Sequence, residues 1–123
     1  MRNSLFVGLF ALFLTNTHAT ELGALTYDAS GDTVIITKCD RIAWGNLVIP
    51  ETIEGKTVIG IAESAFSHCN YLTGITIPNG VTNIGESAFR DCHRLTNITI
   101  PDSVISIGRS AFHYCSSLTS IEI

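Results

Sequence analysis

The sequence is short of positive charge, and this shortage excludes several classes of partner. Its 123 residues contain 7 Lys and Arg against 11 Asp and Glu, a formal net charge of -4, and the basic residues form no run. Nucleic acids and anionic membranes are usually bound by clusters of Lys and Arg. We therefore expect no nucleic-acid partner.

The motifs of common catalytic and cofactor sites are also missing. The sequence contains no G-x-S-x-G turn for a nucleophile, and neither G-x-x-x-x-G-K-[ST] nor G-x-G-x-x-G for a phosphate. Its four cysteines include no Cys-x-x-Cys pair of the kind that binds zinc. His68, His93 and His113 fall at different positions of the sequence pattern described below, so they are expected to lie separately on the surface. The sequence thus predicts no catalytic residue, no cofactor and no metal site.

Only one long apolar segment is present, and it lies at the N-terminus. Arg2 precedes the apolar residues 5–14, which are followed by the small-residue sequence THA at 17–19. This order is typical of a secretory signal peptide, here residues 1–19. An apolar stretch of about ten residues is too short for a transmembrane helix, which needs roughly 20. The sequence therefore predicts export to the cell surface or beyond, with no membrane span in the mature chain.

The main positive feature of the sequence is an internal repeat of 23 residues. Residues 72–94 read LTGITIPNGVTNIGESAFRDCHR, residues 95–117 read LTNITIPDSVISIGRSAFHYCSS, and residues 118–123 restart the unit as LTSIEI. A partial earlier copy occupies residues 47–71, and residues 20–46 lack the repeat. Repeats of this length form solenoids, because one coil can bury its apolar residues only against the next.

Each repeat predicts one coil with a strand and a turn region. Ile75 and Ile77 alternate with Thr76, which is the period of a strand with one buried face. Phe89 and Cys92 have the spacing of a short helical or 3₁₀ turn. The predicted fold is an α/β repeat solenoid, a right-handed stack with a parallel strand sheet. Its expected core contains Leu72, Ile75, Ile77, Phe66, Phe89, Phe112, Cys69, Cys92 and Cys115.

The two ends of the repeat array predict different structures. Residues 25–27 and 34–37 read as extended runs around the turn-forming residues 28–32, so residues 20–46 predict a β-hairpin that caps the first coil. The strand at 118–123 would present an apolar, unpaired edge. We expect that this edge is covered, either by further chain in a longer natural protein or by self-association.

The repeat also carries a family resemblance. The motif L-T-x-I-x-I-P-x-x-V-x-x-I-G-x-x-A-F-x-x-C occurs at 72–92 and again at 95–115. It resembles the BspA-like leucine-rich repeats of bacterial and protozoan surface and secreted proteins, over residues 47–123. The resemblance implies an adhesive role with the strand sheet as the binding face, but it supplies no set of contact residues. Gly80 and Ser103 stand where commoner leucine-rich repeats carry Asn or Cys, so no asparagine ladder is expected.

Three of the four cysteines recur at one position of the repeat. Cys69, Cys92 and Cys115 are each 23 residues apart, whereas Cys39 lies outside the pattern. Stacked cysteines are expected to pack as small apolar groups in the core. A disulfide between neighbouring coils is the alternative, because the spacing of adjacent strands lies within bridging range.

A row of outward-facing residues on the strands is the candidate binding face. The row and its flanking threonines consist of Val48, Thr76, Thr99 and Glu122, with Thr73, Thr96 and Thr119. Threonine is favoured on half-exposed strands, and this preference alone accounts for the row. As a surface it predicts recognition of a protein or a carbohydrate. Two other roles stay open: a spacer within a longer surface protein, and an ice- or surface-binding array of threonines.

Overall fold

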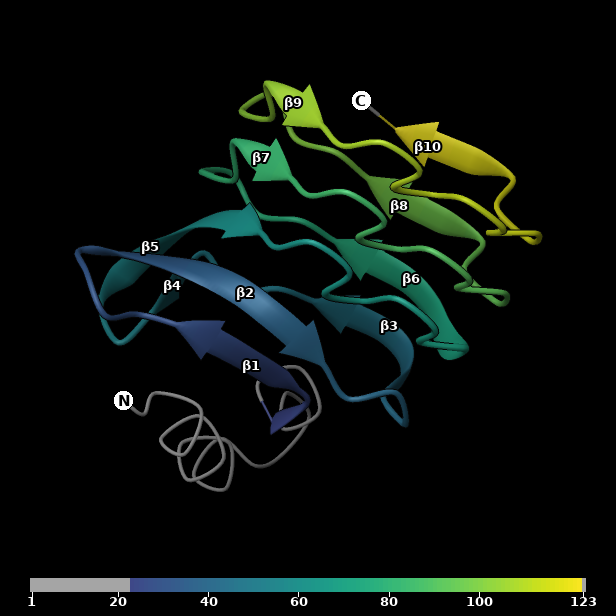
Figure 1. Ribbon diagram of the computed structural model, residues 1–123, viewed down its shortest axis with the longest axis horizontal. Helices are drawn as coiled ribbons and strands as arrows, with labels where there is room; N and C mark the ends of the chain where they lie inside the picture. Colours follow the sequence, from purple (N-terminus) through teal and green to yellow (C-terminus); the bar gives the residue numbers. More distant parts are fainter. Residues whose placement is uncertain (1–22, 123) are drawn as a thin grey trace.

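The computed structural model describes residues 23–122, and the predicted signal peptide lies outside this range. The described chain winds into stacked coils that contribute strands to two sheets (Figure 1). The first sheet has the order β1-β2-β5-β7-β9 with β4 beside β5, and the second has the order β10-β8-β6-β3. The strands are β1 Leu25–Asp28, β2 Thr33–Cys39, β3 Trp44–Val48, β4 Thr52–Ile53, β5 Lys56–Ile61, β6 Tyr71–Thr76, β7 Asn83–Ile84, β8 Asn97–Thr99, β9 Ser106–Ile107 and β10 Ser120–Glu122.

Parallel pairing keeps the coils in phase. In the second sheet Ile75 pairs with Ile98, and Ile98 pairs with Ile121. In the first sheet Ile84 pairs with Ile107 in the same way. Equivalent residues of successive repeats are therefore direct neighbours, which is the parallel stack that the repeat predicts.

A column of aromatic rings runs along the stack, with one ring from each coil. The ring centroids of Phe66 and Phe89 lie 5.0 Å apart, and those of Phe89 and Phe112 lie 5.4 Å apart, both in stacked geometry. Phe66 and Phe89 are fully buried. Burying one such side chain contributes about 1.5–3 kcal/mol, so the column is a main source of the stability of the stack.

One glycine in each repeat lets neighbouring coils approach closely. A Cβ atom on Gly85 would lie 2.6 Å from the backbone nitrogen of Glu63, and one on Gly108 would lie 2.5 Å from that of Glu86. No side chain fits at such distances. The recurrence of glycine at this position therefore follows from the packing of one coil's backbone on the next.

The turn regions differ from the helical segments that the sequence predicts. The described residues contain no helical element of this kind, and the segments 63–68, 86–91 and 109–114 are turns. Each turn contains two residues in the left-handed region, with φ between 55° and 63°: Ser64 and His68, Ser87 and Asp91, Ser110 and Tyr114. A right-handed helix requires negative φ at every position, so the expected helical or 3₁₀ turn is not confirmed for these segments.

The N-terminal part of the described chain forms a hairpin that continues the first sheet. Strands β1 and β2 pair antiparallel, and β2 then pairs parallel with β5. The Tyr27 hydroxyl donates a 2.7 Å hydrogen bond to a carboxylate oxygen of Glu54, and burial together with this carboxylate raises the pKa of Tyr27. The hairpin lies at the N-terminal end of the stack (Figure 1). Its role as a cap stays a prediction.

Candidate binding face

The central row of the candidate face runs across all four strands of the second sheet. Val48 pairs with Thr76, Thr76 pairs with Thr99, and Thr99 pairs with Glu122. Val48, Thr76 and Thr99 are exposed, whereas the side chain of Glu122 lies outside the described part of the chain. Residues that lie far apart in the sequence thus form one continuous line on the surface.

The flanking threonines form a second row with a structural role. The Thr96 hydroxyl donates to the backbone carbonyl of Thr73 at 3.0 Å, and the Thr119 hydroxyl donates to that of Thr96 at 3.1 Å. Each of these carbonyls also accepts the backbone N–H of the same threonine. The hydroxyl protons are therefore engaged within the protein, and this row offers a partner mainly methyl groups and oxygen lone pairs.

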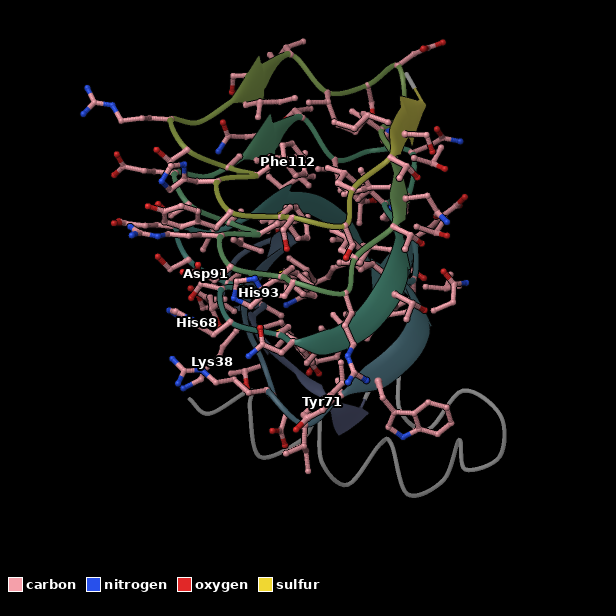
Figure 2. The ribbon with its side chains drawn as sticks, turned by 90° about the vertical axis from the view of Figure 1, so that its right-hand side faces the viewer. Lys38, His68, Tyr71, Asp91, His93 and Phe112 are labelled. Atoms are coloured by element: carbon pink, nitrogen blue, oxygen red, sulfur yellow. The ribbon has the colours of Figure 1, made fainter. Side chains whose placement is uncertain are left out.

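A third row on the same face was missed by the sequence analysis. Trp44 pairs with Tyr71, and the guanidinium carbon of Arg94 lies 5.6 Å from the centroid of the Tyr71 ring. Trp44 is 69% exposed and Tyr71 is 50% exposed, although large aromatic side chains are usually mostly buried. Tyr71 lies at the lower end of the molecule in Figure 2.

A β-bulge explains why this row could not be found by counting. The pairing of β3 with β6 shifts between Gly45 and Asn46. Trp44 therefore pairs with a residue 27 positions later, whereas Leu47 pairs with Ile75, 28 positions later. The sequence signal for this row was the residue before the leucine that opens each repeat. This residue is aromatic at Tyr71 and basic at Arg94.

The expected core residues lie inside, with a graded boundary at the last coil. Leu72, Ile75 and Ile77 are buried, as are the earlier members of the aromatic and cysteine columns. Phe112 and Cys115, in the third repeat, are only partly buried and pack against the core from its end.

The cysteines are free thiols that bond to the preceding coil. The Cys92 thiol donates to the carbonyl oxygen of Phe66 at 3.1 Å, and the Cys115 thiol donates to that of Phe89 at 3.0 Å. All four cysteines are unpaired in the structure. The neighbouring Cys115 side chain and burial both raise the pKa of Cys92. The Cys92 thiol therefore stays protonated at neutral pH.

Two histidines converge on one aspartate, which the sequence did not predict. The Nε2 atoms of His68 and His93 lie 3.6 Å and 4.0 Å from the Asp91 carboxylate oxygens, which also face Arg90 at 3.3 Å (Figure 2). His113 instead packs against Tyr114, with ring centroids 3.9 Å apart. Within residues 23–122 no group of three potential ligands has the geometry to hold a metal ion.

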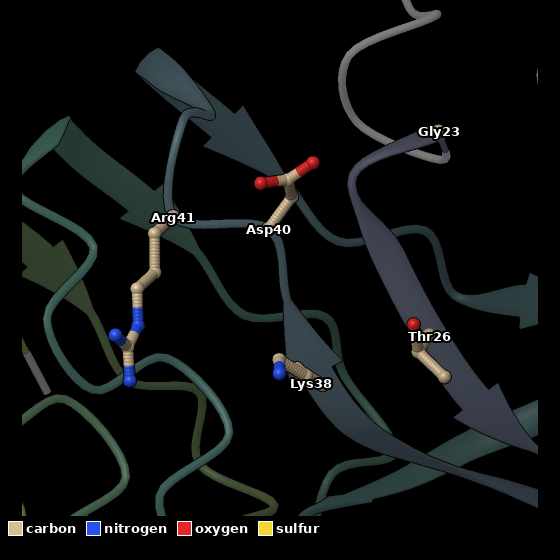
Figure 3. Close-up of a pocket in the computed structure, with 5 residues that line it drawn as sticks. All are labelled: Gly23, Thr26, Lys38, Asp40 and Arg41. Atoms are coloured by element: carbon tan, nitrogen blue, oxygen red, sulfur yellow. The ribbon is translucent and has the colours of Figure 1, made fainter.

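A shallow pocket of about 470 Å³ lies beside the hairpin (Figure 3). It is lined by Gly23, Thr26, Lys38, Asp40 and Arg41. Thr26 and Lys38 are paired across β1 and β2, and Asp40 and Arg41 follow in the next turn. A carboxylate oxygen of Asp40 accepts the backbone N–H of Ile42 at 3.1 Å, which gives this acid a structural role in the turn.

Residues 43–123 match a family described as a BspA type leucine rich repeat region with six copies of the unit. Three solved bacterial proteins are similar in structure. A leucine-rich cell surface protein from Faecalibacterium prausnitzii A2-165 is 34% identical with a TM-score of 0.66 over 79% of this chain. A leucine-rich repeat protein from Bacteroides ovatus ATCC 8483 is 36% identical with a TM-score of 0.70 over 80% of this chain. One from Bacteroides capillosus ATCC 29799 is 27% identical with a TM-score of 0.55, over 81% of this chain and 94% of its own length.

The present chain spans only 28% and 27% of the first two of these proteins. No curated protein shows significant similarity to it. In residues 23–122 there is no helix with the length and apolar character required to cross a bilayer.

Proposed function

Because the chain belongs to the BspA-type leucine-rich repeat family, we propose that it is a recognition module at the cell surface or beyond. It binds a protein or a carbohydrate through the exposed face of the second sheet. A similar structure is that of a leucine-rich cell surface protein, which supports this location. The predicted signal peptide at residues 1–19 supports it independently.

The observation that carries the proposal is the alignment of exposed residues across β3, β6 and β8. The register brings Val48, Thr76 and Thr99 into one row, with a row of threonines and a row of aromatic and basic residues beside it. The underlying strands are held by parallel pairing and by the buried isoleucines beneath them. Stacked repeats of this kind present a rigid, extended surface that suits an extended partner.

The test places two positive charges in the middle of this face. The test variant carries Thr76→Arg and Thr99→Arg, and the control variant carries Thr33→Arg and Thr57→Arg. Both variants and the unmodified protein are tested against immobilised extracellular proteins and polysaccharides. Thr33 and Thr57 are also exposed, paired neighbours, but they lie on the first sheet. We expect the first variant to weaken binding at least about tenfold, which corresponds to 1.4 kcal/mol, and the control to bind normally.

Equal binding by both variants would show that another surface is used. Binding of no member of the panel by the unmodified protein would instead favour the spacer role. The threonine hydroxyls offer little support for ice binding, because Thr96 and Thr119 donate to backbone carbonyls.

We propose, second, that the chain self-associates through the last described coil, which has exposed apolar side chains. Ile105 is 84% exposed and Ile107 is 44% exposed. Every earlier coil is covered by the next one, so a coil of another copy is a chemically suitable cover for these side chains. Light scattering over a range of concentrations should show association that Ile105→Lys with Ile107→Lys abolishes. A concentration-independent monomer would reject this proposal.

A further inference from the structure

We propose that the row Trp44, Tyr71 and Arg94, together with Asn46 and Asn97, binds a glycan chain whose pyranose rings carry carboxylate groups. This inference rests on the proposed function, since the row lies on the same face of the second sheet. It adds the chemical class of the ligand and the residues that recognise it.

The aromatic side chains provide the apolar part of the site. Trp44 and Tyr71 are neighbours across β3 and β6, and both keep large ring areas in water. Adjacent strands lie about 4.8 Å apart, which is comparable to the length of one pyranose unit in an extended chain. The C–H groups of a sugar ring can pack on the face of an indole or phenol, while the polar edges of these side chains stay hydrated or bond to hydroxyls.

Two amide groups lie next to the aromatic row, on either side of Gly74. A Cβ atom on Gly74 would lie 2.4 Å from Asn46 Oδ1 and 3.2 Å from Asn97 Oδ1, so both amides lean over the position where a side chain is missing. Asn46 and Asn97 are both exposed, so their amides are accessible to a ligand. Each amide offers two donors and one acceptor oxygen, a combination that suits vicinal sugar hydroxyls.

The charge of the face favours an acidic glycan over a neutral one. Glu122, at the end of the central row, is the one charged residue of β3, β6, β8 and β10, and Arg94 precedes β8 as a cation beside the aromatic row. This cation stands out in a chain with a net charge of -4. The guanidinium lies over the Tyr71 ring, so its N–H groups can still reach outward in its plane and pair with a carboxylate. A single cation is too few for nucleic-acid binding, which uses several phosphate contacts.

The chain contains one tryptophan, Trp44, so its fluorescence reports directly on the site. Oligomers of polygalacturonate, their methyl esters and a sialylated oligosaccharide are titrated into the full chain, with polyglutamate as a non-sugar polyanion. We expect the acidic sugars to shift the emission to the blue and to protect Trp44 from acrylamide quenching. Polyglutamate should do neither. Lack of a shift with both acidic sugars, or an equal shift with polyglutamate, would overturn the inference.

Variants separate the contribution of charge from that of stacking. Arg94→Gln should reduce the preference for polygalacturonate over its methyl ester from about tenfold or more to near unity, because the ester lacks the carboxylate. Tyr71→Ala should weaken the binding of both forms. Arg109→Gln and Tyr114→Ala are the matched controls for Arg94→Gln and Tyr71→Ala, and both lie in the turn at 109–114. Tyr114 resembles Tyr71 because it is 59% exposed and has an arginine, Arg90, near its ring. Controls that weaken binding as much as the row variants would also overturn the assignment.

Glycan binding by the Trp44→Ala variant is measured by calorimetry, and the fold of the variant is checked by circular dichroism. Loss of glycan binding here supports the assignment. A second outcome is that Trp44→Ala leaves all binding intact, while Thr76→Arg with Thr99→Arg abolishes binding to a protein partner. In that case the glycan inference fails and the proposed function stands. If acidic glycans bind and only the substitutions in the Trp44 row affect them, the inference stands and the central row is removed from the site.

Discussion

The repeats at 72–94 and 95–117 have nearly the same sequence but different environments. Ile84 is fully buried, whereas its equivalent Ile107 is 44% exposed. Phe89 and Cys92 are fully buried, whereas Phe112 and Cys115 are only partly buried. The earlier repeat has a described coil on each side, while the later one is followed only by the short strand β10. Burial is therefore a property of the position in the stack, and the same side chain contributes different amounts of stability in the two repeats.

The largest expected difference lies in the phenylalanine column. Phe89→Ala should lower the free energy of unfolding by about 3–5 kcal/mol, the usual cost of removing a large aromatic side chain from a core. Phe112→Ala should lower it by about 1–2 kcal/mol, because part of this ring is already in water. Urea denaturation followed by circular dichroism measures both. Equal losses would mean that the end coil is covered in solution.

The second difference concerns the glycine that lets neighbouring coils approach closely. Gly85→Ala should cost about 1–3 kcal/mol by overpacking, because its new methyl group would meet the backbone of residues 62 and 63. Gly31→Ala serves as the control, since nothing lies within 4 Å of a Cβ atom there. Its effect should stay within about 0.5 kcal/mol, as for ordinary surface substitutions. A neutral Gly85→Ala in the same denaturation assay would show that the coils can separate slightly at no cost.

A smaller contrast is expected for single methyl groups in the first sheet. Ile84→Val should cost about 0.5–1.5 kcal/mol, whereas Ile107→Val should cost less than about 0.5 kcal/mol. Thermal unfolding of the two variants resolves this order. A reversed order would contradict the burial difference between the two repeats.

The last contrast involves reactivity with almost no change in stability. In the folded protein Cys115 should react with a thiol reagent at least about ten times faster than Cys92, since the thiolate is the reactive form. The neighbouring Cys92 side chain lowers the pKa of Cys115, while Cys115 and burial raise the pKa of Cys92. Labelling followed by peptide mapping identifies the site, and Cys115→Ser should remove the fast phase. A fast phase that maps to Cys92 would be inconsistent with the described packing.

Several features of the fold could be predicted because each depends on a repeated local pattern. The spacing of Leu72, Leu95 and Leu118 predicted a stack in phase, and the pairing of Ile75 with Ile98 has this register. The same motif indicated the BspA-like family, and the family match over residues 43–123 confirms this prediction. The expected helical turns are not confirmed, because Ser87 and Asp91 adopt left-handed backbone angles that the sequence pattern does not indicate.

The candidate face was predictable only in part. Thr76 and Thr99 could be placed in one row by counting, because no bulge lies between β6 and β8. Trp44 could not be placed beside Tyr71, because the bulge in the pairing of β3 with β6 changes the count. The convergence of His68 and His93 on Asp91 also escaped counting, because these residues come from different positions of adjacent coils.

The sequence by itself determined the coil: its length, its apolar positions and the phase in which copies stack, since these follow from a pattern repeated every 23 residues. The tertiary structure decided how deeply each copy is buried, because burial depends on which coils lie on either side. It also decided which non-equivalent residues meet, because a one-residue bulge and the left-handed turns move side chains by amounts that no periodic pattern records.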